Sequence, residues 1–68
     1  MRIFHMHVTV DTFGYYGMHL RRPSGFGSWI FRIGTETIWF EDMLYDDALR
    51  KAKRKASALS VSRIYLLG

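Results

Sequence analysis

The chain contains no cysteine and a single proline among its 68 residues. Without cysteine it has neither a disulfide framework nor a thiolate zinc site. This absence suits a reducing compartment, so we expect a cytoplasmic protein. Its uncharged stretches are short, and residues 23–31 are rich in glycine and serine. No long apolar run follows Arg2, so we expect neither a signal peptide nor a membrane-spanning segment.

Patterns typical of catalytic sites are missing as well. No glycine-rich stretch ends in the Gly-Lys-Ser/Thr of a P-loop, and no hydroxyl residue stands in a nucleophile–base–orienter arrangement. Four carboxylates fall near an expected helix start, where capping and the helix dipole account for them. They are Glu41, Asp42, Asp46 and Asp47. We therefore expect a protein that is not an enzyme and that uses no cofactor.

Histidine is the remaining candidate for binding a metal ion. His5 and His7 fall on one side of an expected strand, about 6.6 Å apart along the chain, and His19 follows later. Two histidines at this spacing supply at most half of a zinc shell, and no thiol completes it. We expect structural or incidental histidines and no metal site.

The residues that are abundant are apolar or basic. Hydrophobic residues make up 49% of the sequence and aromatic residues 16%. This composition suits a single small domain over residues 1–68 that folds by burying large rings. The formal net charge of +4 favours an acidic partner, which can be nucleic acid, an anionic membrane surface or an acidic protein.

Alternating apolar residues predict the outer strands. Residues 2–10 form a β-rich segment in which Phe4, Met6, Val8 and Val10 face the core, whereas Ile3, His5, His7 and Thr9 face outward. Residues 11–17 are typical of a turn, residues 17–23 of an optional short strand, and residues 24–28 of a loop. Residues 63–67 are expected to form the final strand.

A hairpin gives the clearest local signal, because residues 29–33 and 36–40 flank Gly34-Thr35. A two-residue loop led by glycine favours a type II′ turn. That register pairs Ile33 with Glu36, Phe31 with Ile38 and Trp29 with Phe40 on one face, and Ile30 with Trp39 and Arg32 with Thr37 on the other. A three-residue loop would shift the pairing and move Trp39 to the opposite face.

Helical periodicity follows over residues 44–60, with Asp42 as the expected N-cap. The apolar residues fall within an arc of about 100°, and they are Tyr45, Ala48, Leu49, Ala52, Ala56 and Leu59. The expected fold class is therefore α+β. It is a two-layer sandwich in which an antiparallel-rich sheet of three to five strands carries one helix on one face, in the order β-(β)-β-β-α-β.

Five of the six residues from 50 to 55 are basic, namely Arg50, Lys51, Lys53, Arg54 and Lys55. Asp46 with Arg50 and Asp47 with Lys51 have the i,i+4 spacing of helical ion pairs. These pairs would leave the last three cations without a local partner. The bases spread over about 200° of the helix, so both a solvated face and a phosphate-binding surface fit them.

Further candidate contacts lie outside the helix. Arg21 and Arg22 stand near the rings of Tyr15, Tyr16 and Phe26, and proteins that bind single strands combine arginine with exposed rings in this way. The alternative is that the rings only cover the edge of a small core.

Arg32 and Trp39 would decorate the outer face of the sheet. Some DNA-binding proteins read a groove with strands, so this face is a further candidate contact surface.

Two functions fit this sequence. The leading hypothesis is a small non-enzymatic nucleic-acid-binding protein that uses the helix cations and the loop arginines, with Trp39 or the Tyr15-Tyr16 pair stacking on bases. The alternative is a protein-interaction module or homodimer that buries Ile3, Ile30 and Trp39 of the outer sheet face. Salt separates the two, because it weakens phosphate binding and does not weaken apolar burial.

Overall fold

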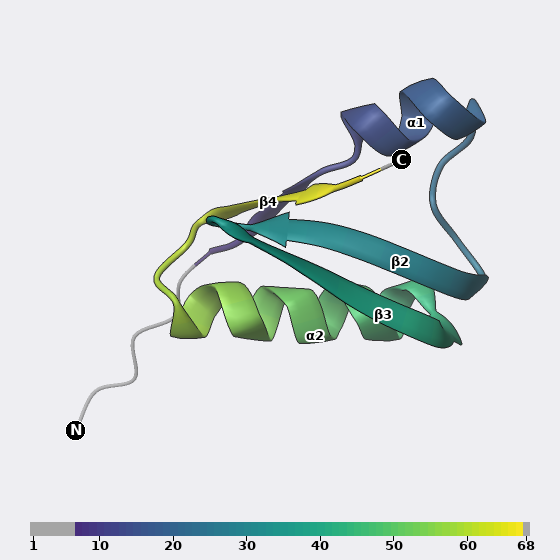
Figure 1. Cartoon of the computed structure of the whole chain (residues 1–68). Coiled ribbons are helices and arrows are strands. Elements are labelled where there is room, and N and C mark those ends of the chain that lie inside the picture. Colours follow the sequence, from purple (N-terminus) through teal and green to yellow (C-terminus); the bar gives the residue numbers. More distant parts are fainter. Residues whose placement is uncertain (1–6, 68) are drawn as a thin grey trace.

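The computed structural model describes residues 7–67 as a four-stranded sheet with two helices (Figure 1). In chain order the elements are β1 (Thr9–Asp11), α1 (Phe13–His19), β2 (Phe26–Ile33), β3 (Glu36–Leu44), α2 (Tyr45–Ala58) and β4 (Arg63–Leu66). The α+β class predicted from the sequence is confirmed. A second helix, α1, takes the place of the optional strand.

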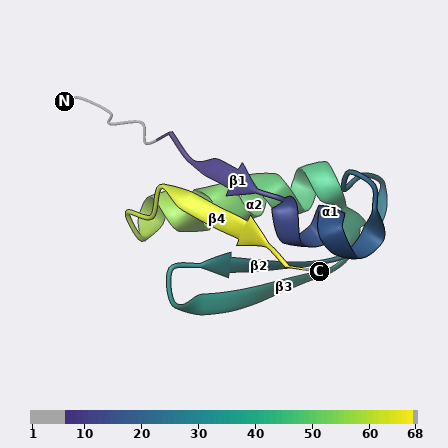
Figure 2. The same cartoon turned by 90° about the horizontal axis from the view of Figure 1, so that it is seen from above.

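The strand order in the sheet is β1-β4-β2-β3. Strand β2 pairs antiparallel with both β3 and β4, whereas β1 pairs parallel with β4. Because β3 and β4 both run opposite to β2, they run in the same direction, and α2 is the crossover between them. We call the face covered by α2 the inner face. Figure 2 looks onto the opposite, outer sheet face, with α2 behind the strands.

The β2–β3 hairpin has the predicted register along its whole central part. Trp29 pairs with Phe40, Ile30 with Trp39, Phe31 with Ile38, Arg32 with Thr37, and Ile33 with Glu36. Gly34 has a φ of 64°, the positive value that the first central residue of a type II′ turn requires. Trp39 is accordingly exposed on the outer sheet face, as predicted.

The predictions of a turn over residues 11–17 and a strand over residues 17–23 are wrong, because residues 13–19 form α1 and residues 20–23 belong to no helix or strand. The side chain of Asp11 accepts a hydrogen bond of 2.9 Å from the backbone N–H of Phe13 and so starts the helix. Tyr15 is buried and lies 5.7 Å from Trp29 between ring centroids. Tertiary burial of this ring therefore outweighs the low helix propensity of the two glycines in α1. The helix ends at Leu20, which has a left-handed φ of 56°.

Strand β3 continues to Leu44, so the predicted N-cap role of Asp42 is also wrong. A β-bulge interrupts the β2–β3 register between Gly27 and Trp29, and Asp42 has a φ of 55° within the same region of β3. Between the pairs formed by Gly27 and by Trp29, β3 has one residue more than β2. This bulge bends β3 and lets it continue to the start of α2. The N–H of Tyr45 donates a 2.8 Å hydrogen bond to the carbonyl of Gly25, which anchors the helix start.

Small side chains let α2 lie close on the inner face of the sheet. Ala48, Ala52 and Ala56 have no exposed surface, as the helical periodicity predicts. The residues buried on the strands are Trp29, Phe31, Ile33, Ile64 and Leu66, and Val8, just before β1, is buried with them. Leu59 was predicted to join this core but is 43% exposed, because the helix ends one residue earlier.

Tyr45 joins the core at the start of α2, with its ring 5.0 Å from that of Trp29. Burial raises the pKa of the Tyr45 hydroxyl above its ordinary value of 10.0, and the negative charge of Asp46 adds to the effect. The phenol is therefore neutral at physiological pH.

Strand β1 is shorter than the segment predicted for residues 2–10. Val8 is buried, Val10 is half-buried and Thr9 is exposed, as the alternation predicts. The expected positions of Ile3, Phe4, His5 and Met6 lie outside the described residues. Within residues 7–67, neither helix is long and apolar enough to cross a bilayer.

Candidate nucleic-acid interface

The structure distributes the nine predicted contact residues over three surfaces. Five lie on α2 and form the α2 surface, which consists of Arg50, Lys51, Lys53, Arg54 and Lys55. Arg32 and Trp39 lie on the outer sheet face, on the other side of the sheet from α2. Arg21 and Arg22 lie in the connection between α1 and β2.

The α2 surface exists because the alanines of α2 turn toward the sheet. With Ala48, Ala52 and Ala56 facing inward and Leu49 packed against the core, the basic residues between them face outward at helical pitch. Lys53 is half-buried and the other four cations are exposed. Alanine packing therefore fixes one side of α2 against the core and leaves the cations at the surface.

Part of the α2 surface borders a shallow depression of about 470 Å³ between α2 and the start of β1. It is lined by His7, Val8, Arg50, Lys53, Arg54 and Ser57. The four helix positions in this set are spaced i, i+3, i+4 and i+7, so they form one stripe along the helix. No carboxylate is among the lining residues, but Asp47 binds Arg50 from outside this set, so Lys53 and Arg54 are the cations that leave positive charge beside the depression.

The ion pairs on α2 differ from the predicted ones. Asp47 binds Arg50 at 2.6 Å rather than Lys51, and Lys55 lies 3.8 Å from Glu36 of β3. All four side chains are well exposed, so each pair contributes little to stability. Within residues 7–67, three cations of the α2 surface have no carboxylate at ion-pair distance. They are Lys51, Lys53 and Arg54.

The outer sheet face carries rings on both sides of a central arginine. Arg32 on β2 pairs with Thr37 of β3 and with Tyr65 of β4. Trp39 of β3 pairs with Ile30, which lies two residues before Arg32 on β2. Trp39 is 61% exposed and Tyr65 42% exposed. Tyr65 was not among the predicted contacts. The alternation of Ile64 and Leu66, both buried, is the signal that would have placed it outward.

More apolar surface lies toward the bulged end of the hairpin. Phe26 pairs with Leu44, and the two residues are 69% and 50% exposed. Arg21 lines a small depression of about 270 Å³ whose other lining residues include Phe26 and Ile30. Arg21 therefore borders the outer sheet face, on the same side as Arg32 and Trp39.

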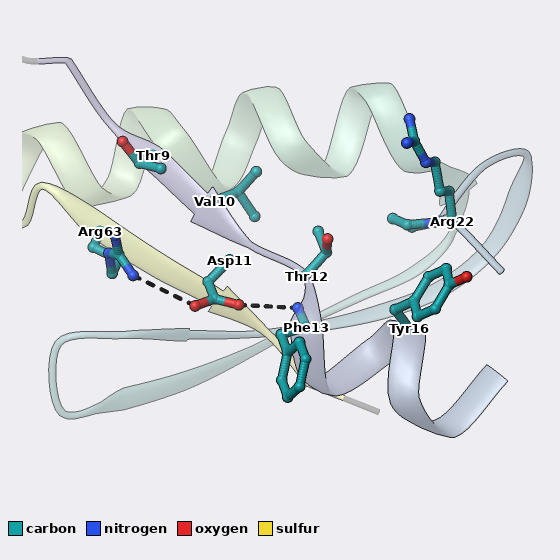
Figure 3. A pocket seen from close by; sticks show the side chains of 9 residues that line it. Thr9, Val10, Asp11, Thr12, Phe13, Tyr16, Arg22 and Arg63 are labelled. Atoms are coloured by element: carbon teal, nitrogen blue, oxygen red, sulfur yellow. Dashed lines mark hydrogen bonds and ion pairs between the residues drawn. The ribbon is translucent and has the colours of Figure 1, made fainter. Parts of the chain in front are cut away.

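Arg22 borders a different depression, of about 760 Å³, beside β1 and α1. Figure 3 shows Arg22 beside Tyr16 at one end of this depression and Arg63 at the other, with Asp11 between them. Asp11 lies 3.4 Å from Arg63 while it also holds the start of α1 (Figure 3). Much of the positive charge of Arg63 is therefore balanced locally.

Only one ring of the predicted Tyr15-Tyr16 stacking pair is free for a ligand. Tyr16 is 50% exposed, whereas Tyr15 is buried and stacks on His19 with ring centroids 4.1 Å apart. The prediction that the pair stacks on bases is therefore wrong for Tyr15. Here the alternative, in which a ring covers the edge of the core, is the correct one.

The described histidines lie at separate places. His7 lines the depression beside α2, and His19 lines the one beside Arg21. Within residues 7–67 no three side chains of metal-binding type lie together. His5 lies outside the described residues.

Comparisons with known proteins find no match, so a proposal for the function of this chain rests on the geometry described above. No family model, no curated protein and no solved structure matches the chain.

Proposed function

We propose that this chain is a small non-enzymatic nucleic-acid-binding protein that contacts phosphates through the α2 surface. One observation carries the proposal. Lys53 and Arg54, which have no carboxylate at ion-pair distance within residues 7–67, line a single depression together with His7 and Arg50. The absence of cysteine suits a reducing compartment, so we place the protein in the cytoplasm as part of this proposal.

The charge distribution of α2 supports binding to a polyanion. A cation that is already paired gains less from a phosphate than one that is free, so the relevant set is Lys51, Lys53 and Arg54. Each phosphate that these residues neutralise would release condensed counterions, which makes affinity fall as salt rises. The net charge of +4 adds a long-range attraction of the same sign.

The first prediction concerns the variant Lys51→Gln/Lys53→Gln/Arg54→Gln. Glutamine keeps the helix propensity of these positions and removes three charges, so the fold should persist. We expect weaker binding to a mixed oligonucleotide and a slope of log K against log salt that is shallower by about two to three units. Fluorescence anisotropy over a salt series measures both quantities.

A charge-preserving variant, Lys51→Arg/Lys53→Arg/Arg54→Lys, is the matched control and should keep the wild-type slope. Thermal melts followed by circular dichroism check that both variants remain folded. The proposal fails if the wild-type protein binds no oligonucleotide near about 50 mM salt, where the electrostatic contribution is strong. It also fails if the glutamine variant keeps the wild-type slope.

A second function is favoured by the apolar character of the outer sheet face. Trp39 and Tyr65 are exposed there, and Phe26 and Leu44 extend the apolar surface. A protein-interaction module or homodimer would bury these side chains against its partner. Light scattering at low and high salt, with and without oligonucleotide, distinguishes the two functions. Self-association that survives high salt supports the interaction module, and a monomer whose oligonucleotide complex dissociates in salt supports nucleic-acid binding.

A further inference from the structure

We propose that the outer sheet face is a stacking platform for unpaired bases, so that the nucleic acid bound there is single-stranded. This inference rests on the proposed function and names its ligand class. The platform consists of Trp39 on β3, Arg32 and Ile30 on β2, and Tyr65 on β4.

Strand register places the two rings on either side of the arginine. Tyr65 is the direct cross-strand neighbour of Arg32, and Trp39 is the diagonal neighbour on the opposite strand. Two strand spacings separate the rings across the sheet, which is about 10 Å. A strand crossing the platform would thus meet a ring, a guanidinium and a second ring in succession.

The exposure of these rings is what a stacking ligand needs. Trp39 is 61% exposed and Tyr65 is 42% exposed, although the other tryptophan, Trp29, is only 4% exposed. In Figure 2, α2 lies behind the strands and α1 lies at one end of the sheet, near the C-terminus. Base–ring stacking is available to every base, because each has a π-face, so the platform would tolerate many sequences.

Single strands fit this face better than a duplex does. In a duplex the π-faces of the bases are already stacked on one another, and a protein ring can reach them only after a base is unstacked. The platform also carries few phosphate contacts of its own. Arg32 is the cation at its centre, and Arg21 and Arg63 lie at its margins. Its binding should therefore depend less on salt than binding to the α2 surface does.

The charges on the platform argue against a second copy of the chain as the occupant. In a two-fold symmetric dimer each surface patch packs on itself. Arg32 lies near the centre of the platform, so the guanidinium groups of two copies would be brought near the axis and desolvated together, which disfavours association. A single-stranded nucleic acid instead brings phosphates to Arg32 and bases to the two rings.

The two tryptophans supply a direct test, because Trp39 is exposed and Trp29 is shielded. The second prediction is that a thymidine homopolymer of about 12 nucleotides, within the range of known single-strand sites, quenches tryptophan fluorescence saturably. Trp39→Ala should abolish this quenching and lower single-strand affinity about 5- to 100-fold, the effect of losing one base–ring stack. Duplex affinity measured in parallel should stay within about two-fold of wild type, because the α2 surface supplies the phosphate contacts.

Three control variants make the assignment specific. Trp39→Phe keeps a ring and should retain most of the affinity. Phe13→Ala removes an exposed ring of α1, outside the sheet, and should leave binding unchanged. The glutamine variant of the α2 surface should still be quenched by the single strand at low salt.

The failures of the two proposals are distinguishable. Binding that depends on the α2 surface but neither quenches Trp39 nor weakens in Trp39→Ala overturns the platform and leaves the proposed function standing. Equal loss of single-strand and duplex affinity in Trp39→Ala also overturns it. Absence of binding to either nucleic acid at low salt overturns both. A shift in oligomeric state in Trp39→Ala, with no change in nucleic-acid affinity, would assign the face to a protein partner.

Discussion

Single residues in the left-handed region stand where this chain changes direction. Leu20 ends α1, Asp42 lies at the bulged part of β3, and Ser60 follows α2, each with a φ between 55° and 58°. Leucine and serine have no intrinsic preference for this conformation, so the surrounding elements hold the backbone there. Glycine takes the same role without strain at Gly25 and Gly34.

A matched pair of glycines makes the third prediction. Gly34→Ala should lower the free energy of unfolding by about 1 kcal/mol or more, because a Cβ is unfavourable at a φ of 64° and would lie 3.4 Å from a methyl carbon of Val61. Gly17→Ala should raise it by about 0.5–1 kcal/mol, since this position is helical and nothing lies within 4 Å of the added methyl group. Urea denaturation measures both. Equal effects of the two substitutions would contradict the turn geometry.

Among the elements, those with strong local signals were predictable and those that depend on distant contacts were not. The hairpin register followed from Gly34-Thr35 and alternating apolar residues, and the inward side of α2 followed from its alanines. Helix α1 was not predictable, because it depends on packing Tyr15 against Trp29, a residue that lies on another element. The end of β3 was missed because acidic residues near a helix start resemble a cap.

The candidate site shows the same division. The cations of α2 were found from sequence, since they are contiguous and their side of the helix follows from its periodicity. Their placement behind the sheet, away from Arg32 and Trp39, depends on which face α2 covers. The predicted hairpin register, which puts Arg32 and Trp39 on the outer face, already indicated this separation. The pairing of β2 with β4, which brings Tyr65 beside Arg32, was not predictable, because it joins segments far apart in the sequence.

The fourth prediction tests the contact between α2 and the sheet. Ala52→Asp would place an unpaired charge at a position with no exposed surface, at a cost of about 3–5 kcal/mol. This is comparable to the whole stability of a small domain, so the variant should lack a cooperative thermal transition. Ala58→Asp, at the exposed last residue of α2, is the control. It should cost about 1 kcal/mol or less through the helix dipole. A folded, cooperatively melting Ala52→Asp protein would refute the packing.

At the scale of the whole molecule, β4 connects the first strand, β1, to the rest of the sheet. It pairs with β1 on one side and with β2 on the other, and it contributes the buried Ile64 and Leu66. The prediction of a final strand within the sheet is confirmed. Within the described sheet, β1 has no strand neighbour apart from β4.

The fifth prediction follows from this position. A chain that ends at Ser62 should lose its cooperative melting transition, because it lacks two core side chains and the strand that holds β1 in the sheet. Arg63→Ala is the control. It removes only an exposed ion pair with Asp11, so it should change the free energy of unfolding by about 1 kcal/mol or less. Differential scanning calorimetry compares the two proteins, and an unchanged melting temperature after truncation would contradict the central role of β4.

The pairing of β1 with β4 also sets the order in which the molecule can assemble as it is synthesised. Thr9 leaves the ribosome more than fifty residues before its partner Arg63, and contacts between such distant segments form slowly. Until β4 emerges, the edge of β2 that it covers is an open row of hydrogen-bonding groups beside apolar side chains, which other chains can pair with. We therefore expect the nascent chain to be prone to aggregation until β4 has emerged and paired with β2.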